Sequence, residues 1–147
     1  IIIEDYAHHP TEIKASLEAI RIMARGKKII LVFQPHRYSR TYYLYKEMAN
    51  SISTADYIFL LDIYPASERP IEGVDSRLIL NELLVLNRNS KWIRSNEELE
   101  NELELLGIDG SVIVFMGAGD IDCIRKQIVS RLKEKLEKMS QFHVILR

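Results

Sequence analysis

A histidine and two arginines stand together in segment 34–41, which has the sequence QPHRYSRT. The segment follows the continuous apolar run 29–33, which is typical of a strand buried on both faces, and precedes a segment with helical potential at 42–53. In open α/β sheets, ligands bind where a buried strand gives way to a helix. Arg37 and Arg40 could fork onto a carboxylate or phosphate, with backbone N–H groups of the helix start as further donors. The segment therefore predicts an anion site, whereas the simpler alternative leaves both arginines as solvated loop charges.

The sequence DYAHHP at 5–10 supplies a second polar group. An acid, a phenol and two imidazoles follow the short apolar segment 1–3, and Pro10 suits the first position of a helix. The acid Glu12 complements the positive end of that helix. Apolar residues then recur with helical spacing, which predicts one buried helix face, at Ile13, Leu17, Ile20 and Ala24.

A third group is the turn Gly-Ala-Gly-Asp at 117–120, between the apolar run 112–116 and a long amphipathic segment. A strand, a glycine turn and a helix in this order resemble a phosphate-binding turn. The third glycine of the dinucleotide-binding pattern is absent, however, and so are the lysine and hydroxyl of a P-loop. The alternative is that the glycines only permit a tight turn.

Segments of strand and helix type alternate along the chain. We expect strands at 1–3, 29–33, 57–61 and 112–116 with a short candidate at 92–93, and helices at 10–24, 42–53, 76–84, 96–106 and after 120. This alternation predicts an α/β fold, a Rossmann-like three-layer sandwich with a mostly parallel sheet of about six strands and helices on both faces. The carboxyl ends of the strands would then gather three of the four histidines and the long loop 62–75 at one edge. That convergence favours a ligand site there.

Other side chains carry simpler expectations. We expect the tyrosines of segment 42–45 to pack in an amphipathic helix rather than to stack on a ligand. Cys123 should be a small buried residue of a helix. The glutamates of helix 96–106 should form a solvated face, because they spread around it instead of converging as metal ligands would. The sequence leaves open whether the tail 140–147 adds an edge strand or is disordered.

Composition excludes several classes of protein. The 147 residues suit a single domain, and the net charge of −1 gives no nucleic-acid footprint. One cysteine allows no internal disulfide and favours a reducing compartment. No apolar run reaches the roughly 18 residues of a membrane span, and no signal peptide is visible. The chain begins with Ile within a strand-like run, so we expect it to be a piece of a longer protein.

Four segments together resemble the C-terminal domain of the UDP-N-acetylmuramate–L-alanine ligases, a family of Mur ligases. They lie in the family's order, at 5–12, 33–41, 70–76 and 117–120. The resemblance runs from about residue 1 to 135, and the first two motifs together are highly specific. The sister ligase that attaches a whole murein tripeptide shares the acid–aromatic–Ala–His–His–Pro motif but not the Gln-Pro-His-Arg-Tyr block.

The resemblance implies an ATP-dependent amide-bond ligase that joins L-alanine to UDP-N-acetylmuramate through an acyl phosphate, in cytoplasmic peptidoglycan synthesis. Members of the family have an N-terminal UDP-sugar domain, a central P-loop ATPase domain and this C-terminal domain. ATP and Mg²⁺ would be bound mainly by the central domain. The isolated chain 1–147 should therefore be inactive, with no nucleic-acid or membrane partner.

The resemblance also implies roles for particular residues. The L-alanine pocket would be lined by Tyr6, His8, His36, Arg37 and Arg40. Arg40, with Arg37, would bind the alanine carboxylate, and His8 would orient or deprotonate the amine as the catalytic residue. Asp5 would face the ribose or phosphate of ATP, and no metal ligand is assigned. His9 could equally be a helix-start residue without a ligand. The alternative from another class is a non-catalytic α/β module that binds an anion or nucleotide.

Overall fold

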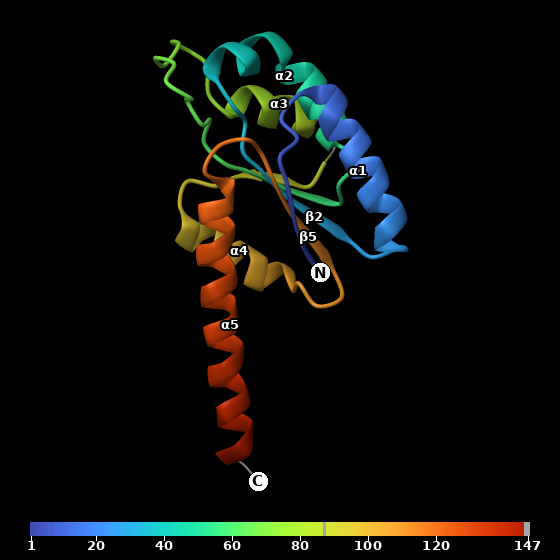
Figure 1. Ribbon diagram of the computed structural model, residues 1–147, viewed down its shortest axis with the longest axis vertical. Helices are drawn as coiled ribbons and strands as arrows, with labels where there is room; N and C mark the ends of the chain where they lie inside the picture. The colour runs from blue at the N-terminus through green and yellow to red at the C-terminus, as the bar shows by residue number, and fades with distance from the viewer. Residues whose placement is uncertain (87, 146–147) are drawn as a thin grey trace.

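The computed structural model describes residues 1–86 and 88–145. Its centre is a parallel sheet with the spatial strand order β1-β5-β2-β3-β4 (Figure 1). The strands are β1 (Ile2–Asp5), β2 (Ile29–Phe33), β3 (Tyr57–Leu60), β4 (Ser90–Trp92) and β5 (Val112–Met116). The predicted α/β fold and the common strand direction are confirmed, but within the described residues the sheet has five strands where about six were expected.

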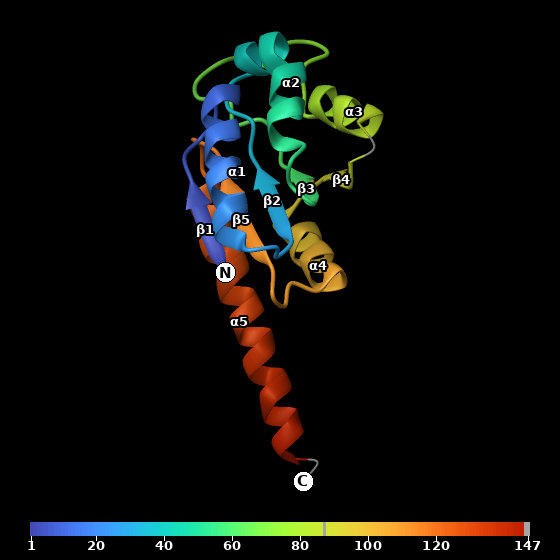
Figure 2. The ribbon, with the colours of Figure 1, turned by 90° about the vertical axis from the view of Figure 1, so that its right-hand side faces the viewer.

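Helices cover both faces of the sheet (Figure 2). They are α1 (Pro10–Ala24), α2 (Tyr38–Ile52), α3 (Arg77–Val85), α4 (Asn96–Leu106) and α5 (Ile121–Ile145). The first three pack into one apolar cluster with the sheet, and α4 and α5 pack into a second cluster on the opposite face. The three-layer arrangement expected from the alternating pattern is therefore present.

The described part of the tail, residues 140–145, belongs to a helix. Helix α5 continues to Ile145, and its second half projects away from the sheet in both ribbon views (Figures 1 and 2). Leu146, the last residue of the candidate tail strand, lies outside the described residues. The described residues of the tail therefore add no strand to the sheet.

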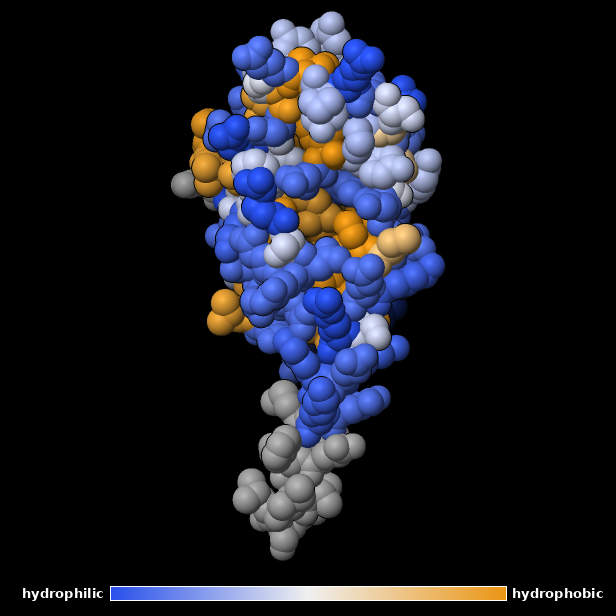
Figure 3. Space-filling view, turned by 90° about the vertical axis from the view of Figure 1, so that its left-hand side faces the viewer, coloured by the Kyte–Doolittle hydropathy of each residue, from blue (hydrophilic) through white to orange (hydrophobic). Residues whose placement is uncertain are grey.

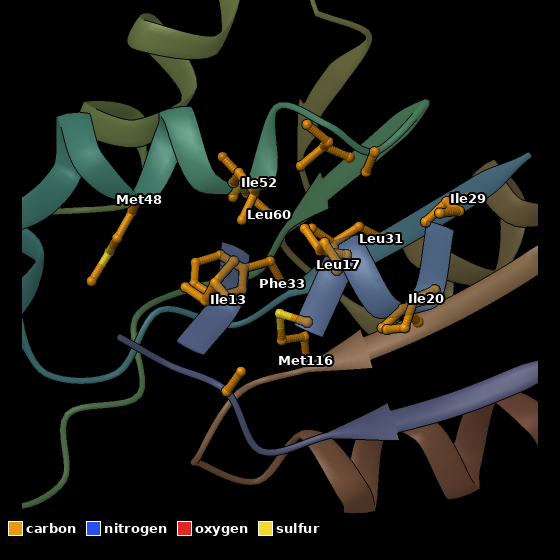
Figure 4. Close-up of a cluster of buried hydrophobic side chains, with 14 of the residues drawn as sticks. Ile13, Leu17, Ile20, Ile29, Leu31, Phe33, Met48, Ile52, Leu60 and Met116 are labelled. Atoms are coloured by element: carbon orange, nitrogen blue, oxygen red, sulfur yellow. The ribbon is translucent and has the colours of Figure 1, made fainter. Parts of the chain in front are cut away.

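Strands β2 and β5 are buried along their whole length, as expected for central strands of a parallel sheet. Successive side chains of β2 point to opposite faces, so that Leu31 and Phe33 join the cluster under α1 and α2 while Val32 joins the cluster under α4 and α5. Figure 4 shows the first cluster, in which the stripe of α1 meets the sheet. Its labelled members are Ile13, Leu17, Ile20, Ile29, Leu31, Phe33, Met48, Ile52, Leu60 and Met116.

Helix α2 begins at Tyr38 rather than at Tyr42. Arg37 is its N-cap residue, and the Arg37 carbonyl accepts hydrogen bonds from the backbone N of Thr41 at 3.1 Å and from its Oγ1 at 2.9 Å. The earlier start matters for the site, because Arg40 now lies in the first helical turn and not in the preceding loop. Its guanidinium lies 3.1 Å from Nδ1 of His36, in the segment that follows β2.

Three side-chain predictions are wrong in whole or in part. Tyr42 and Tyr43 are exposed, at 53% and 75%, because other residues fill the buried stripe of α2, whereas Tyr45 packs against the first apolar cluster as predicted. Cys123 is exposed because neighbouring residues of α5, and not Cys123 itself, face the sheet. Among the glutamates of α4, Glu100 is buried, because basic side chains of α5 pair with it.

No helix within the described part of the chain is long and apolar enough to cross a membrane. On the face shown in Figure 3, hydrophilic side chains surround a strip of hydrophobic ones, and hydrophilic side chains cover the coloured part of the projecting helix.

Candidate functional site

The strand order brings three of the sequence motifs to one edge of the sheet. Strands β1 and β2 both pair with β5, and Asp5 and Phe33 are each in register with Met116, the last residue of β5. The segments that follow these strands carry the Asp-Tyr-Ala-His-His motif, the His-Arg motif and the glycine turn. The predicted convergence at the carboxyl edge is confirmed, and this edge is where α/β sheets bind ligands.

Four aromatic rings form a continuous row across this edge, here called the ring row. Tyr6 and His8 lie edge to face with ring centroids 5.4 Å apart, and His8 and His36 do the same at 5.4 Å. His36 stacks on Tyr64 at 5.7 Å with the planes 14° apart. The two histidines predicted for the ligand pocket are therefore in contact, and a tyrosine that the sequence did not single out completes the row.

The proton of His36 can be placed from its partner. Nδ1 of His36 lies 3.1 Å from Nη1 of Arg40, and a guanidinium can only donate, so Nδ1 accepts and the proton of the neutral ring is on Nε2. Burial lowers the pKa of His36 below its ordinary value, and the positive charge of Arg40 lowers it further. His36 is consequently a neutral imidazole at neutral pH, with an N–H group available to a ligand.

His8 has the opposite tautomer. Its Nδ1 lies 3.0 Å from the carbonyl oxygen of Tyr6, which can only accept, so Nδ1 is the donor and Nε2 keeps its lone pair when the ring is neutral. The carboxylate of Glu12 lies 3.5 Å from the same Nδ1. This carboxylate also accepts from the backbone N atoms of His8 and His9 at 3.2 Å each, and these bonds lower its pKa. His8 is thus held with one nitrogen bound and the other free to take a proton.

His9 has a structural position at the start of α1. It is the N-cap residue, its side chain accepts from the backbone N of Thr11 at 3.4 Å, and Glu12 completes a capping box. Pro10 occupies the first turn as predicted. His9 is therefore the helix-start residue that the sequence analysis offered as its simpler alternative.

Neither predicted anion-binding arginine has an ion-pair partner within residues 1–86 and 88–145. Arg40 is half-buried, and its Nη1 donates to Nδ1 of His36. Arg37 is exposed, and its backbone has the unusual dihedral angles φ 73° and ψ 138°. Such a conformation costs of order 1–3 kcal/mol in a residue other than glycine and concentrates at functional sites. Both cations are available to an anion from outside the domain.

The start of α2 contributes less than the sequence predicted. Glu68, from the long loop, accepts hydrogen bonds from the backbone N of Ser39 at 3.0 Å and from its Oγ at 2.6 Å, which lowers the pKa of Glu68. A carboxylate of the chain itself thus occupies donors that were expected to add to an anion site. The anion-binding capacity of this edge accordingly resides in the arginine side chains.

Asp5 lies at the end of β1, beside an open hollow of about 390 Å³. Its carboxylate accepts from the backbone N of Ala7 at 2.8 Å and from the hydroxyl of Ser16. The hollow is lined by Asp5, Tyr6, Ala7, Glu12 and Ser16, so it contains two acids and no basic residue. This lining suits hydroxyl donors better than phosphate oxygens.

The Gly-Ala-Gly-Asp turn is packed too closely to cradle a phosphate. A Cβ atom at Gly117 would lie 2.8 Å from the carbonyl oxygen of Gln34, and one at Gly119 would lie 2.4 Å from Cγ of Tyr64. Gln34 also donates from Nε2 to the carboxylate of Asp120 at 2.6 Å. The turn therefore requires glycine for close packing, which favours the tight-turn interpretation over a phosphate site.

Sequence reasoning missed Tyr64 and Glu68, which both come from the long loop after β3. Their only signal was the length of that loop, because neither residue belongs to a spacing pattern. In the part of the chain that the structure describes, no group of three or more His, Cys, Asp and Glu residues could hold a metal ion.

Comparison with known proteins shows the family of this chain. The family described as "Mur ligase, glutamate ligase domain" matches residues 1–119. The UDP-N-acetylmuramate–L-alanine ligase of Cytophaga hutchinsonii is 48% identical over 122 residues, which are 83% of this chain and 25% of that protein. The enzyme of the same name from Desulforamulus reducens is 42% identical over 135 residues, 91% of this chain and 29% of that protein.

A solved structure of the same family has a similar fold. The UDP-N-acetylmuramate–alanine ligase of Thermotoga maritima superposes with a TM-score of 0.72 at 26% sequence identity, covering 91% of this chain and 27% of that one. The chain thus spans between a quarter and three tenths of the length of these proteins. Because the family match covers most of the chain, the chain belongs to the Mur ligase family.

Proposed function

We propose that this chain is the C-terminal domain of a three-domain, ATP-dependent ligase that joins L-alanine to UDP-N-acetylmuramate in cytoplasmic peptidoglycan synthesis. The observation that carries the proposal is a pair of arginines that have no ion-pair partner within residues 1–86 and 88–145, next to two contacting histidines at the carboxyl edge of the sheet. The names of the curated relatives support it, and their greater length accommodates the other two domains.

The reaction class determines what the site must do. A carboxylate oxygen of the sugar's lactyl group attacks the γ-phosphorus of ATP, and ADP leaves as an acyl phosphate forms. The amine nitrogen of L-alanine then attacks the acyl carbon, and inorganic phosphate leaves as the amide bond forms. Both steps build negative charge on oxygen, so preplaced cations lower their barriers. Mg²⁺, which we assign mainly to the central domain, would neutralise phosphate charge.

Arg40 is the residue that we assign to the carboxylate of L-alanine. It is half-buried in the first turn of α2, has no carboxylate partner among the residues that the structure describes, and donates one N–H to the His36 ring. A guanidinium held in this way can present its other N–H groups to both oxygens of a carboxylate. Arg37, exposed beside it, is the second cation of the same clamp.

His8 is the residue that we assign to the amine. The amine must lose a proton to attack, and Nε2 of neutral His8 carries the free lone pair that can accept it. The Tyr6 carbonyl accepts a hydrogen bond from Nδ1 and so keeps the lone pair of the neutral ring on Nε2. Tyr6 and His36 flank His8 in the ring row and would close the pocket around the methyl group of alanine. A small pocket discriminates only modestly against glycine or serine.

We assign Asp5 to the binding of ATP, and we favour contact with the ribose over contact with the phosphates. The hollow beside Asp5 contains a second acid, Glu12, and no basic side chain, so a phosphate would be repelled there. Ribose hydroxyls could donate to the oxygen lone pairs that Ala7 and Ser16 leave free.

A coupled phosphate-release assay on the full protein that carries this chain tests the proposal. The assay contains ATP, Mg²⁺ and UDP-N-acetylmuramate, with L-alanine added or omitted. Phosphate release that requires both the sugar and L-alanine is the expected result. A Lys→Ala change in the P-loop of the expected central domain is the control and should abolish release.

The same assay separates two alternatives. Release supported by the murein tripeptide and not by L-alanine would assign the protein to the sister ligase. A non-catalytic anion-binding module, which the unpaired arginines also allow, would give no release with either substrate. Calorimetry with L-alanine and with UDP-N-acetylmuramate would then identify what such a module binds.

A further inference from the structure

Tyr64 lies between the glycine turn and the two-histidine site. One face of its ring stacks on His36, with ring centroids 5.7 Å apart. Its Cβ and Cγ atoms lie against Gly119, where an added Cβ would come within 2.7 and 2.4 Å of them. No room therefore remains for any side chain between the turn and the Tyr64 ring.

The backbone of Tyr64 is joined to the same segment independently of its ring. The backbone N of Tyr64 donates to the Pro35 carbonyl at 2.8 Å, and the Tyr64 carbonyl accepts from the backbone N of Arg37 at 2.8 Å. This pair of bonds makes an isolated parallel bridge between His36 and Tyr64. The backbone bridge holds the backbone N of Arg37, whereas the ring of Tyr64 contacts His36 and Gly119.

The turn is itself fixed to the end of β2. Gln34 is only 6% exposed and donates from Nε2 to Asp120 at 2.6 Å. Its Oε1 lies within 2.6 Å of the position that a Gly119 Cβ would take. The hydrogen bond between Gln34 and Asp120 thus links the turn to the residue that follows β2, and both atoms of the Gln34 amide lie close to the turn.

From these contacts we propose that Tyr64, seated on Gly119, is a positioning residue that sets the orientation of the His36 ring and, through it, the guanidinium of Arg40. The proposal deepens the proposed ligase function and rests on it where L-alanine binding is concerned. It also gives the glycine turn a role in the site that involves no phosphate. The contact from Tyr64 to His36 and the bond from His36 to Arg40 form one continuous path.

The pKa of His36 is a measurable quantity that depends on the surroundings of its ring, including several charged groups. Arg40 from α2, Arg37 from the N-cap, His8 from the β1–α1 segment and Glu68 from the long loop all act on it. Burial is the largest cause of its lowered pKa. Removing the Tyr64 ring admits water to one face of His36, so the pKa of His36 should rise towards its ordinary value.

Three substitutions in the full protein test the proposal. Tyr64→Phe keeps the ring and should change little. Tyr64→Ala removes the stacking partner, and Gly119→Ala displaces the ring while leaving Tyr64 in the chain. Tyr43→Ala, at a tyrosine that is exposed on α2, is the matched control for the loss of a tyrosine.

The two readouts are the pKa of His36, from NMR of histidine-labelled protein, and the KM for L-alanine. Tyr64→Ala and Gly119→Ala should both raise the pKa of His36 and raise the KM for L-alanine on the order of tenfold, since a small misplacement of a binding group is costly. The KM for UDP-N-acetylmuramate should stay within about twofold. A His36 pKa and a KM for L-alanine that are both unchanged in Tyr64→Ala would overturn the proposal.

The two proposals fail in different ways. If no L-alanine-dependent turnover occurs in the unaltered protein, the ligase function fails, yet the pKa of His36 still reports whether Tyr64 positions the ring. If Tyr64→Ala does not fold, Gly119→Ala and Tyr64→Phe still provide the comparison. A Tyr64→Phe variant that behaves like Tyr64→Ala would also contradict the proposal, because the ring alone is assigned the positioning role.

Discussion

At the scale of single residues, hydrogen-bond partners place the proton of the neutral ring on Nε2 in His36 and on Nδ1 in His8. His36 accepts at Nδ1 from Arg40 and can donate at Nε2, whereas His8 donates at Nδ1 to a carbonyl and can accept at Nε2. Because the rings touch, a substrate with a carboxylate and an amine would meet a donor, a cation and a base within one small region. An amino acid carries both groups, which is consistent with the proposed substrate.

Arg40 provides the most direct test of this assignment. Removing a hydrogen bond to a charged group costs about 1.5–3 kcal/mol, or roughly ten- to a hundredfold in affinity. In the full enzyme, Arg40→Ala should raise the KM for L-alanine by that factor and leave the KM for the UDP-sugar nearly unchanged, in steady-state kinetics. Arg40→Lys retains the charge but not the fork, so its effect should be intermediate. Equal increases in both KM values would argue against a carboxylate clamp.

His36 also predicts a dependence of stability on pH. Its pKa in the folded chain lies below the ordinary value of about 6.5, so the unfolded chain binds the proton more readily as the pH falls. The free energy of unfolding should therefore decrease as the pH is lowered through about 6.5, until the folded ring is protonated too. In thermal melts between pH 8 and 5, His36→Gln should show a smaller decrease than the unaltered protein. Identical slopes would contradict the lowered pKa.

At the scale of elements, α4 and α5 are joined by a buried carboxylate. The Glu100 side chain is 7% exposed, and it lies 2.5 Å from Nζ of Lys135 and 3.4 Å from Nη1 of Arg131. The hydrogen bond from Lys135 is the main reason that the pKa of Glu100 is lowered. These contacts fix the long helix against the sheet on the face opposite α1, with no part in the site.

Glu100→Gln should therefore lower stability without changing ligand binding. We expect a loss of about 1 kcal/mol in urea unfolding, because the two basic partners are half-exposed and partly screened by solvent. Glu97→Gln, on the same helix at an exposed position, is the control and should change the free energy of unfolding by less than about 0.5 kcal/mol. An unchanged midpoint for Glu100→Gln would show that the pair contributes nothing measurable.

At the scale of the whole molecule, the strand order of the sheet brings together loops that are far apart in the sequence. Strands β1, β5 and β2 are neighbours although β5 is the last strand in sequence, so residues far apart in the chain meet at one edge. The long loop after β3 closes this edge by pairing Tyr64 with His36. In the proposed ligase this edge would bind L-alanine and part of ATP, and phosphoryl transfer would take place at the P-loop of the proposed central domain.

The chain of 147 residues should accordingly fold on its own but release no phosphate. We expect a cooperative thermal transition by circular dichroism, because two apolar clusters cover both faces of the sheet. Phosphate release in the presence of ATP, Mg²⁺, UDP-N-acetylmuramate and L-alanine should equal that of the buffer. Turnover by this chain alone would contradict its assignment to one domain of a larger enzyme.

The sequence by itself determined the elements and the edge at which the site lies. Continuous apolar runs predicted the buried strands, and helical spacing predicted α1 and α4 closely, because both signals depend on neighbours within one or two turns. The carboxyl-edge rule then placed the His-Arg motif and the Asp-Tyr-Ala-His-His motif together. The start of α2, the exposure of Tyr43 and Cys123 and the burial of Glu100 were predicted wrongly, because each depends on which element packs against it.

Only the tertiary structure decided what each site residue touches. The contact between Tyr64 and His36 joins two segments through a loop that has no periodic pattern, so no local signal could predict it. The same holds for the carboxylate of Glu68, which takes backbone donors at the start of α2 that the sequence had assigned to a ligand. Glycine at 119 showed that a turn was allowed, but its close approach to Tyr64 depends on atoms from two other loops. Residue types and periodicity are local properties of the chain, whereas contacts, burial and the resulting pKa values arise from long-range packing.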